Sequence, residues 1–340
     1  MTELISELEE LCLINGISGD EGRVREYILS RIKDRCETKT DPLGSIIAVK
    51  KGRKPGGRRI AVSAHMDEVG LIVTFITEDG FLKCAPVGGI DPRVVFGRRV
   101  IVGDKQIPGV VGAKALHHLS GEEKKKAPDF GEMYIDIGAK DREQAMEFVR
   151  PGDSVCFEGS FLRFGRGMIK CKAIDDRVGC AIMIKLICDE EFDSDIIFTF
   201  VVQEEVGLRG STAAAYTAEP EEAYVLEATT AADTPLSGGE KKVCRVGAGP
   251  VVSYMDRSTI YSRELYEKAG AAAKELGIKW QTKTMVAGGN DAGAIHKSRG
   301  GVKVCGISLA CRYLHSPCCV ISEEDLGDTY RLVKALLERT

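Results

Sequence analysis

The chain has 340 residues and a formal net charge of -4 at pH 7, with 44% apolar and 6% aromatic residues. The length suits two domains, and the apolar fraction is sufficient for a large core. The weakly acidic balance gives no electrostatic basis for binding nucleic acids or membrane surfaces, and the few aromatic side chains leave little surface for stacking on bases. We therefore expect neither nucleic-acid nor membrane partners.

The first residues and the cysteines favour a reducing compartment. The N-terminal segment lacks the basic and apolar regions of a signal peptide, and no run approaches the roughly 18 apolar residues of a membrane span. The 12 cysteines include no CxxC pair, and several, such as Cys180 and Cys305, lie inside apolar runs. Cysteine in such runs behaves as a small hydrophobic residue. We therefore expect free thiols and a cytoplasmic protein.

The N-terminal part of the chain alternates helix and strand. Apolar residues at helical spacing predict a helix over residues 24–32, and Ser18-Gly19 precedes it as a start signal. Short apolar runs predict strands at 46–49 and 59–64. This is the beginning of an α/β pattern.

The middle of the chain differs in composition. From about residue 70 to 164, short β-like pieces are separated by many glycines, and helical periodicity is scarce. We predict that residues 70–164 form a small β-rich domain inserted into an α/β domain made of residues 1–69 and 165–340. His65 precedes this insertion and Asp175 follows it, so a site built from both would lie where the domains meet.

After residue 165 the alternation is regular. Continuous apolar strands between helices predict a mixed, mostly parallel sheet flanked by helices on both faces. The predicted elements are a nearly all-apolar helix at 177–188, a strand at 196–202, an Ala-rich helix at 212–215, a strand at 223–226, a helix at 264–276, a strand at 302–309 and a helix that begins after Ser322.

Several of these apolar runs end in side chains that can bind metals. His65, Glu205, Glu227 and His315 follow predicted strands, and functional groups in α/β sheets gather beyond the carboxyl ends of strands. Asp175 lies at the start of a helix, where a carboxylate is favoured. Two imidazoles and three carboxylates, with a spare carboxylate at Glu204, are the inventory that a pair of hydrolytic zinc ions needs.

Each of these residues also has an ordinary structural explanation. A lone histidine after a strand is seldom a ligand, but Asp67 could hold one nitrogen of His65 so that the other faces a metal. Asp175 could merely cap its helix, and Glu227 could be a charge at a strand end. Their joint occurrence favours the metal site.

The remaining histidines fit structural roles. His117 and His118 lie in the predicted insertion, and His296 lies on a presumed helix after Gly293. We do not expect them to bind metal.

Eight stretches together carry a resemblance to a known family: Gly16-Ile17-Ser18-Gly19-Asp20-Glu21, Asp41-Pro42-Leu43-Gly44, Ala64-His65-Met66-Asp67-Glu68-Val69-Gly70, Gly88-Gly89-Ile90-Asp91-Pro92-Arg93-Val94, Ala173-Ile174-Asp175-Asp176-Arg177-Val178-Gly179, Glu204-Glu205-Val206-Gly207-Leu208-Arg209-Gly210, Gly288-Gly289-Asn290-Asp291-Ala292-Gly293 and Arg312-Tyr313-Leu314-His315-Ser316-Pro317. In their order and spacing they resemble the cytoplasmic di-metal aminopeptidases that form tetrahedral particles. That group includes glutamyl, leucyl, lysyl and deblocking aminopeptidases, and relatives named cellulase M or endoglucanase M.

The resemblance implies a fold, an assembly and an activity. The fold would be a zinc-peptidase-like α/β catalytic domain with an inserted PDZ-like β domain that aids oligomerisation. Dimers would assemble into tetrahedral dodecamers. The protein would remove N-terminal residues from short peptides by means of a water molecule activated between two divalent metal ions, with Zn²⁺ as the first candidate and Co²⁺ or Mn²⁺ as alternatives.

The resemblance also implies a role for each candidate residue. Asp175 would bridge the two metals, with His65 and Glu227 completing one site. Glu205 and His315 would complete the other site. The two non-ligands are Glu204, the implied general base and then acid, and Asp67, which would support His65.

The chain departs from the family pattern at Glu227, where most relatives have Asp. Glutamate remains an adequate oxygen ligand but is one methylene longer, which bears on the position of one metal and on the room for the substrate amine.

Two rival functions remain open from the residues alone. A glycosidase could use Glu204 and Asp175 as its carboxylate pair, but it would leave His65 and His315 unexplained, and sugar-binding enzymes favour aromatic platforms, whereas Trp280 is the sole tryptophan. A non-catalytic metal-binding scaffold would have no need of the spare carboxylate at Glu204.

Overall fold

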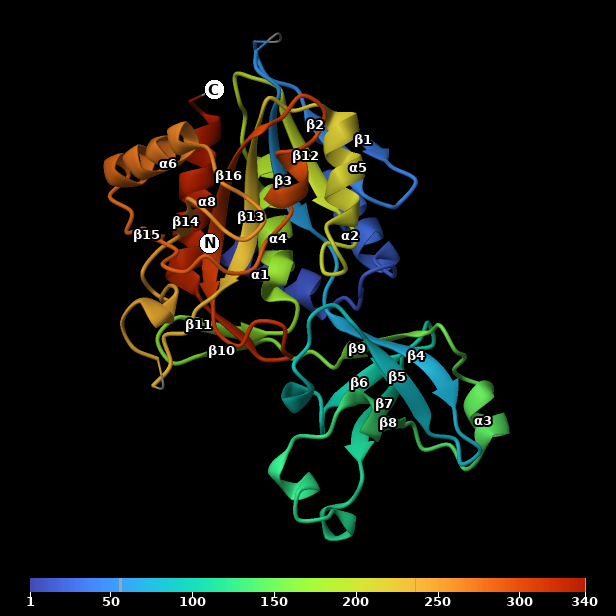
Figure 1. Ribbon diagram of the computed structural model, residues 1–340. Helices are drawn as coiled ribbons and strands as arrows, with labels where there is room; N and C mark the ends of the chain where they lie inside the picture. Colours follow the sequence, from blue (N-terminus) through green and yellow to red (C-terminus); the bar gives the residue numbers. More distant parts are fainter. Residues whose placement is uncertain (55–56, 236, 340) are drawn as a thin grey trace.

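The computed structural model describes residues 1–54, 57–235 and 237–339. A mixed sheet of eight strands runs through the larger part of the molecule (Figure 1). The order of strands across this sheet is β1 (Glu37–Thr40), β2 (Ile46–Lys50), β12 (Ile196–Val201), β3 (Ile60–His65), β13 (Glu222–Thr230), β16 (Lys303–Cys311), β14 (Val251–Ser253) and β15 (Gln281–Thr282).

The centre of the sheet is parallel and its flanks contain antiparallel pairs. Strands β12, β3, β13 and β16 each run parallel to their neighbours in this central group. On one side, β1 and β2 form an antiparallel hairpin, and β2 runs antiparallel to β12. On the other side, β14 runs antiparallel to β16. The prediction of a mixed α/β fold is therefore confirmed, with the parallel strands gathered in the middle.

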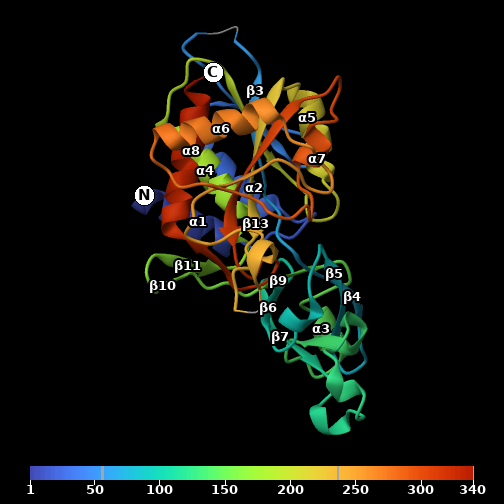
Figure 2. The ribbon, with the colours of Figure 1, turned by 60° about the vertical axis from the view of Figure 1, so that its left-hand side comes forward.

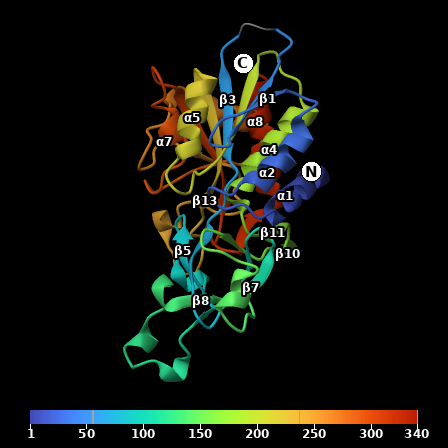
Figure 3. The same ribbon diagram turned by 90° about the vertical axis from the view of Figure 1, so that its right-hand side faces the viewer.

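Helices cover both faces of the sheet, as the view along its edge in Figure 3 shows. One layer contains α1 (Thr2–Leu13), α2 (Gly22–Ile32), α4 (Ile174–Asp189), α6 (Arg263–Glu275) and α8 (Glu323–Leu337). The other layer contains α5 (Arg209–Ala218) and α7 (Ala292–Ile295).

Helix α4 is buried on nearly all sides, because the sheet lies on one side of it and α1 and α2 pack on the other. A helix that is apolar all round is expected in such a position, which explains the continuous apolar run that predicted it. Helix α1 was not predicted, although Leu4, Leu8 and Leu11 form a buried stripe on one of its faces. Gly277 follows the end of α6 in the left-handed conformation, with φ +64°, that commonly terminates a helix, as predicted.

A closed β-barrel lies beyond one end of the main sheet (Figures 1 and 2). Its strands, in order around the barrel, are β4 (Gly70–Ile76), β5 (Leu82–Val87), β8 (Met133–Asp136), β7 (Ile107–Ala113), β6 (Arg99–Val102) and β9 (Ser154–Phe157). Inward side chains such as Leu71, Val73, Val100 and Val155 form a hydrophobic cluster of their own. Closure leaves no free strand edge on this small unit.

A third, three-stranded sheet joins two segments that lead to the candidate site. It is formed by β10 (Leu162–Phe164), β11 (Met168–Cys171) and β17 (Cys319–Ser322). In its antiparallel register Cys171 is paired with Cys319. The chain entering α4 is thereby held beside the chain that follows His315.

The remaining helices are short. They are α3 (Arg142–Met146) and the 3-10 turns η1 (Pro92–Val94), η2 (Leu116–His118), η3 (Glu123–Lys125), η4 (Phe130–Glu132) and η5 (Gly239–Lys242). Within the described part of the chain, none of the helices combines the length and the apolar character that crossing a bilayer requires.

Candidate active site

The predicted metal-binding side chains come together at the carboxyl ends of the central parallel strands. His65 is the last residue of β3, and Glu204 and Glu205 lie just after β12. Glu227 was predicted to follow its strand but lies inside β13, because that strand continues to Thr230. Neighbouring parallel strands end at one edge of a sheet, so residues far apart in the sequence become neighbours there.

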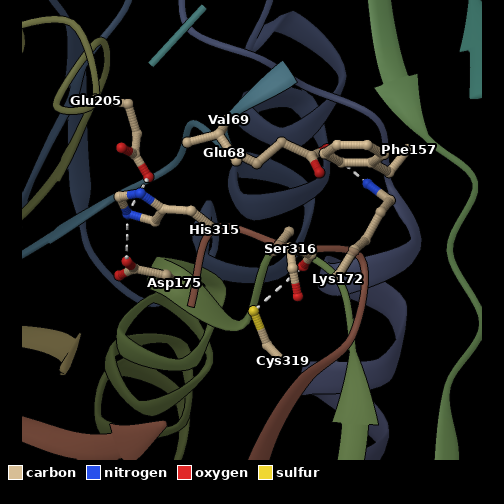
Figure 4. A pocket seen from close by; sticks show the side chains of 10 residues that line it. Glu68, Val69, Phe157, Lys172, Asp175, Glu205, His315, Ser316 and Cys319 are labelled. Atoms are coloured by element: carbon tan, nitrogen blue, oxygen red, sulfur yellow. Dashed lines mark hydrogen bonds and ion pairs between the residues drawn. The ribbon is translucent and has the colours of Figure 1, made fainter. Parts of the chain in front are cut away.

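The two imidazoles face three carboxylates at closely similar distances. His65 Nε2 lies 3.2 Å from Glu227 Oε1 and 3.5 Å from Asp175 Oδ1. His315 Nε2 lies 3.3 Å from Glu205 Oε1 and 3.4 Å from Asp175 Oδ2. Asp175 therefore directs one oxygen towards each imidazole, and Figure 4 shows the ring of His315 between Glu205 and Asp175.

The hydrogen bonds of both imidazoles fit metal ligands. Nδ1 of His65 lies 3.0 Å from the carbonyl oxygen of Asp67, and Nδ1 of His315 lies 2.7 Å from that of Gly89. A carbonyl oxygen only accepts, so Nδ1 carries the hydrogen and a neutral ring has its lone pair on Nε2. That lone pair faces carboxylate oxygens, an arrangement that is repulsive unless a cation or a proton lies between them.

The separations themselves match shared coordination. Two ligand atoms that each lie about 2.1 Å from a tetrahedral zinc ion are about 3.4 Å apart, whereas N–H···O hydrogen bonds centre near 2.9 Å. His65 Nε2 and Glu227 Oε2 are buried without a hydrogen-bond partner. Two groups, His65 with Asp175 and Glu227, and His315 with Asp175 and Glu205, each bring three ligand atoms within 4.8 Å of one another. These residues therefore fit a pair of cations.

The electrostatics of the site favour added positive charge. Burial raises the pKa of Glu205 to about 7, with His315 lowering it and Asp175 raising it. Burial also raises the pKa of Glu227 well above its usual range. Burial alone would lower the pKa of His315, but its contact with the Asp175 carboxylate and the charge of Glu205 raise it to about 10. The carboxylates thus exceed what two imidazoles can neutralise.

Asp67 contacts both His65 and the turn after β12. Its carboxylate oxygen Oδ1 lies 3.4 Å from His65 Nδ1, and its backbone carbonyl oxygen lies 3.0 Å from the same atom. The carboxylate also accepts the backbone N–H of Glu204 at 3.0 Å and that of Glu205 at 3.1 Å. It therefore holds the turn that carries both glutamates.

Glu204 lies against the candidate ligands without joining either three-residue group around Asp175. One of its oxygens is within 4.8 Å of ligand atoms of His65 and Glu205. Burial raises the pKa of Glu204 well above its usual range; His65 opposes this increase, and the charges of Asp291 and Glu205 add to it. A carboxylate so placed can hold or release a proton near the site.

The geometry at the start of α4 argues against a capping role for Asp175, which was the alternative to its role as a metal ligand. Asp175, at φ -82° and ψ 110°, is outside the regular helix, and its Oδ1 accepts the N–H of Ala228 at 3.4 Å. Asp176 Oδ1 accepts the N–H of Gly179 at 3.0 Å, which is the contact of a capping residue. Because Asp176 satisfies the helix end, Asp175 is free to face the imidazoles.

One acid was assigned no role from the sequence. Asp291 is fully buried, and burial raises its pKa to about 6, with His65 opposing this increase and Asp67 adding to it. Its position between glycines and directly before the buried Ala292 was the available signal.

The other histidines lie apart from the site. His117 and His118 belong to η2, and His296 follows α7 with its Nδ1 2.7 Å from the Ala292 carbonyl oxygen.

The chain matches the family model described as M42 glutamyl aminopeptidase over residues 44–332. It belongs to the M42 glutamyl aminopeptidase family. It is therefore a metallo-aminopeptidase, a hydrolase of peptide bonds, and its histidine and carboxylate groups are of the kind that holds divalent metals.

Individual relatives cover nearly the whole chain. The lysyl aminopeptidase of Pyrococcus furiosus is 33% identical over 332 residues, which is 95% of this chain and 93% of that protein. The TET1 peptidase of Pyrococcus horikoshii, which can assemble into a tetrahedron or a large octahedral shell, has a structure with a TM-score of 0.89 and 37% identity over 99% of this chain and 100% of its own. A structure described as an endoglucanase, from Thermotoga maritima, has a TM-score of 0.81 and 34% identity over 98% of this chain and 96% of its own.

Proposed function

We propose that this aminopeptidase removes N-terminal residues from short peptides and holds two divalent metal ions with five side chains. Asp175 is shared, His65 and Glu227 complete one site, and Glu205 and His315 complete the other. The proposal rests on one observation: Asp175 directs one oxygen towards the Nε2 of each imidazole, at 3.5 and 3.4 Å. Zn²⁺ suits these ligands best, with Co²⁺ and Mn²⁺ as alternatives.

Glu204 is the residue that moves the proton in this proposal. Metal ions bound at the site would lower the pKa of a water molecule and polarise the peptide carbonyl. A Glu204 oxygen would accept a proton from the attacking water and pass it to the nitrogen of the leaving amine. The raised pKa of Glu204 supports this role, and Asp67 accepts a hydrogen bond from the backbone N–H of Glu204.

The proposed metal site also accounts for action at the N-terminus of a peptide. The pKa of a free α-amine lies close to neutral pH, so its neutral form would be available to offer a nitrogen lone pair to a bound divalent cation. A blocked amine is an amide, whose nitrogen lone pair is delocalised and does not bind such a cation. We therefore expect the enzyme to require a free N-terminus.

The experiment that tests this function compares four kinds of substrate with one preparation of the enzyme. A panel of aminoacyl chromogenic substrates, run with Zn²⁺, Co²⁺ or Mn²⁺, should be hydrolysed and should reveal the preferred N-terminal residue. The matched N-acetylated substrates, and longer peptides whose N-terminal amine is blocked, should not be cleaved. Release of sugar from a soluble cellulose, with no release of amine, would instead favour the glycosidase suggested by the endoglucanase relative. Metal binding without turnover of any substrate would favour a scaffold.

We further propose that residues 70–164 act as an inserted, PDZ-like oligomerisation domain. The support is the closed barrel with its own hydrophobic cluster and the assembly of the Pyrococcus horikoshii relative into a tetrahedron. Dimers that associate into a tetrahedral dodecamer are the expected form, measured as native mass by light scattering after gel filtration. A mass equal to one 36.9 kDa chain would contradict this proposal.

A further inference from the structure

Three consecutive backbone N–H groups next to the site donate to buried carboxylates. Gln203 donates to Glu21 Oε1 at 3.0 Å, Glu204 to Asp67 Oδ1 at 3.0 Å, and Glu205 to Asp67 Oδ2 at 3.1 Å. The turn that carries Glu204 and Glu205 is therefore bound at every one of these residues by a side chain from another part of the chain.

Glu21 connects this turn to the N-terminal segment 16–21. It stands at the N-cap position of α2 and its side chain is buried, with 3% of the residue exposed. The same Oε1 that accepts from Gln203 also accepts the N–H of Gly19 at 2.8 Å. Ser18 Oγ donates to Asp67 Oδ2 at 2.6 Å. One short segment thus contacts both carboxylates that hold the turn.

The segment 16–21 is itself attached to the end of β3. The N–H of Glu68 donates to the Gly16 carbonyl at 3.0 Å, and the N–H of Gly16 donates to Glu68 Oε1 at 3.2 Å. Ile17 forms a bridge with Glu68. Because His65 ends β3, the segment 16–21 connects the turn at Gln203 with the part of the chain that carries the candidate ligand His65.

The turn has a reason to need such support. Gln203 has φ +56°, a left-handed conformation that a residue with a side chain adopts only when its surroundings impose it. This residue redirects the chain between the end of β12 and Glu204. A hydrogen bond to the N–H of Gln203 fixes the peptide group on one side of that bend, and Asp67 fixes the two that follow.

We propose that Glu21 is a positioning residue for the reaction, which acts by holding the Gln203–Glu205 turn in the conformation that presents Glu204 and Glu205. It contacts neither the substrate nor the candidate metals. The inference rests on the proposed roles of Glu204 as proton carrier and Glu205 as ligand.

Three substitutions separate the length, the charge and the accepting oxygen of Glu21. Glu21→Gln keeps the length and an accepting oxygen but loses the charge, so it should retain most of the native kcat. Glu21→Asp keeps the charge but withdraws the oxygen by one methylene, and Glu21→Met keeps the approximate length without an acceptor. Both should lower kcat by about 10- to 100-fold, the range found when residues that support ligands are replaced, with KM changed little.

Asp325 provides a matched control for loss of stability. It is buried near the start of α8, and its oxygens accept the N–H groups of Gly247 at 2.7 Å and Gly249 at 2.8 Å. The loop that it holds contains none of the candidate ligands. Asp325→Leu should lower the melting temperature and leave kcat of the folded enzyme near the native value.

The outcomes distinguish the inference from the proposed function. Faster amide exchange at residues 203–205 in Glu21→Asp, together with reduced kcat that Glu21→Gln restores, supports the inference. Native kcat in Glu21→Asp and Glu21→Met, or an equal loss in Glu21→Gln, overturns it. If the Glu21→Met protein does not fold, the comparison of Glu21→Asp with Glu21→Gln is sufficient to test the inference. A Glu204→Gln enzyme with native kcat would overturn the proposed role of Glu204 itself, whatever the Glu21 variants do.

Discussion

At the residue scale, the proposed function gives the adjacent carboxylates of Glu204 and Glu205 two different tasks. Glu205 Oε1 lies 3.3 Å from His315 Nε2, within a candidate metal group. Glu204 is partly buried beside that group, and its backbone N–H donates to Asp67. A direct ligand would be a poor base because the metal would occupy its lone pairs, so a neighbouring non-ligand is the better proton carrier.

Replacing Glu204 by Gln should separate these tasks. The amide keeps the size of the side chain but cannot take up a proton, so kcat should fall by at least 10²-fold, the lower end of the contribution of general acid–base catalysis. Metal content, measured by plasma emission spectrometry, should stay at two ions per chain. A near-native kcat would remove Glu204 from its proposed role.

Glu227 tests how far the site depends on side-chain length. Its Oε1 reaches within 3.2 Å of His65 Nε2 from the middle of β13. The Glu227→Asp enzyme should still bind two metals, because aspartate supplies the same kind of oxygen ligand, although the shorter side chain should weaken binding at the His65 site. Metal content that falls to one ion would mean that this site has adapted to glutamate.

Metal binding should release protons in a pH-dependent manner. In the metal-free protein the pKa of His315 is raised to about 10, so its imidazole is protonated at neutral pH. A metal needs the Nε2 lone pair, so binding must displace that proton, and affinity should rise as the pH increases towards 10. Calorimetric titrations with Zn²⁺ in buffers of different ionisation enthalpy would measure the release. It should be smaller in His315→Ala, and an affinity independent of pH would contradict this account.

At the element scale, local pattern predicted the interior of the sheet better than its surroundings. The runs that became β2, β12 and α4 are mainly apolar, and run length and residue type, which distinguish a buried strand from a buried helix, assigned each of them correctly. The end of β13, and the choice between Asp175 and Asp176 as the cap of α4, could not be predicted. Both depend on which neighbour supplies a hydrogen bond, and sequence periodicity carries no information about that.

Helix α1 should contribute stability through the side chains that cover α4. Leu8 is fully buried in the main core, whereas Leu13 in the same helix is 42% exposed. Leu8→Ala should reduce the free energy of unfolding by about 2–5 kcal/mol, the usual result of truncating a buried leucine. Leu13→Ala should change it by less than about 0.5 kcal/mol. Urea unfolding of both variants would measure the difference, and equal values would show that α1 is not part of the core.

At the scale of the whole molecule, the main core and the barrel core are separate clusters, and the site lies at the end of the main sheet nearest the barrel. The carbonyl oxygen of Gly89, in the chain that leaves β5, receives the Nδ1–H of His315. The barrel segment thus contributes directly to the orientation of one candidate ligand.

Removal of metal should affect both activity and stability of the whole protein. Prolonged dialysis against a chelator should abolish peptide hydrolysis, and Zn²⁺ or Co²⁺ should restore it. The melting temperature should also fall, because a ligand that binds the folded state stabilises it and the buried carboxylates would lose their counter-charges. Undiminished hydrolysis in a preparation free of metal would refute the proposed mechanism.

The sequence by itself determined the types of the side chains and their place at the ends of apolar segments. Hydrophobic periodicity is local, so the alternation of helices and strands, and with it the meeting of strand ends, could be predicted from it. The eight family-like stretches added the expected division of His65, Asp175 and Glu205 between two metals.

Only the tertiary structure decided which atoms meet. It directed the carboxylate of Asp67 to the backbone N–H groups of Glu204 and Glu205 as well as towards His65. It also placed Glu21 against Gln203, 182 positions away in the chain. Such contacts depend on the register of the sheet and on the path of loops, which are set by the packing of the whole core and not by any local pattern.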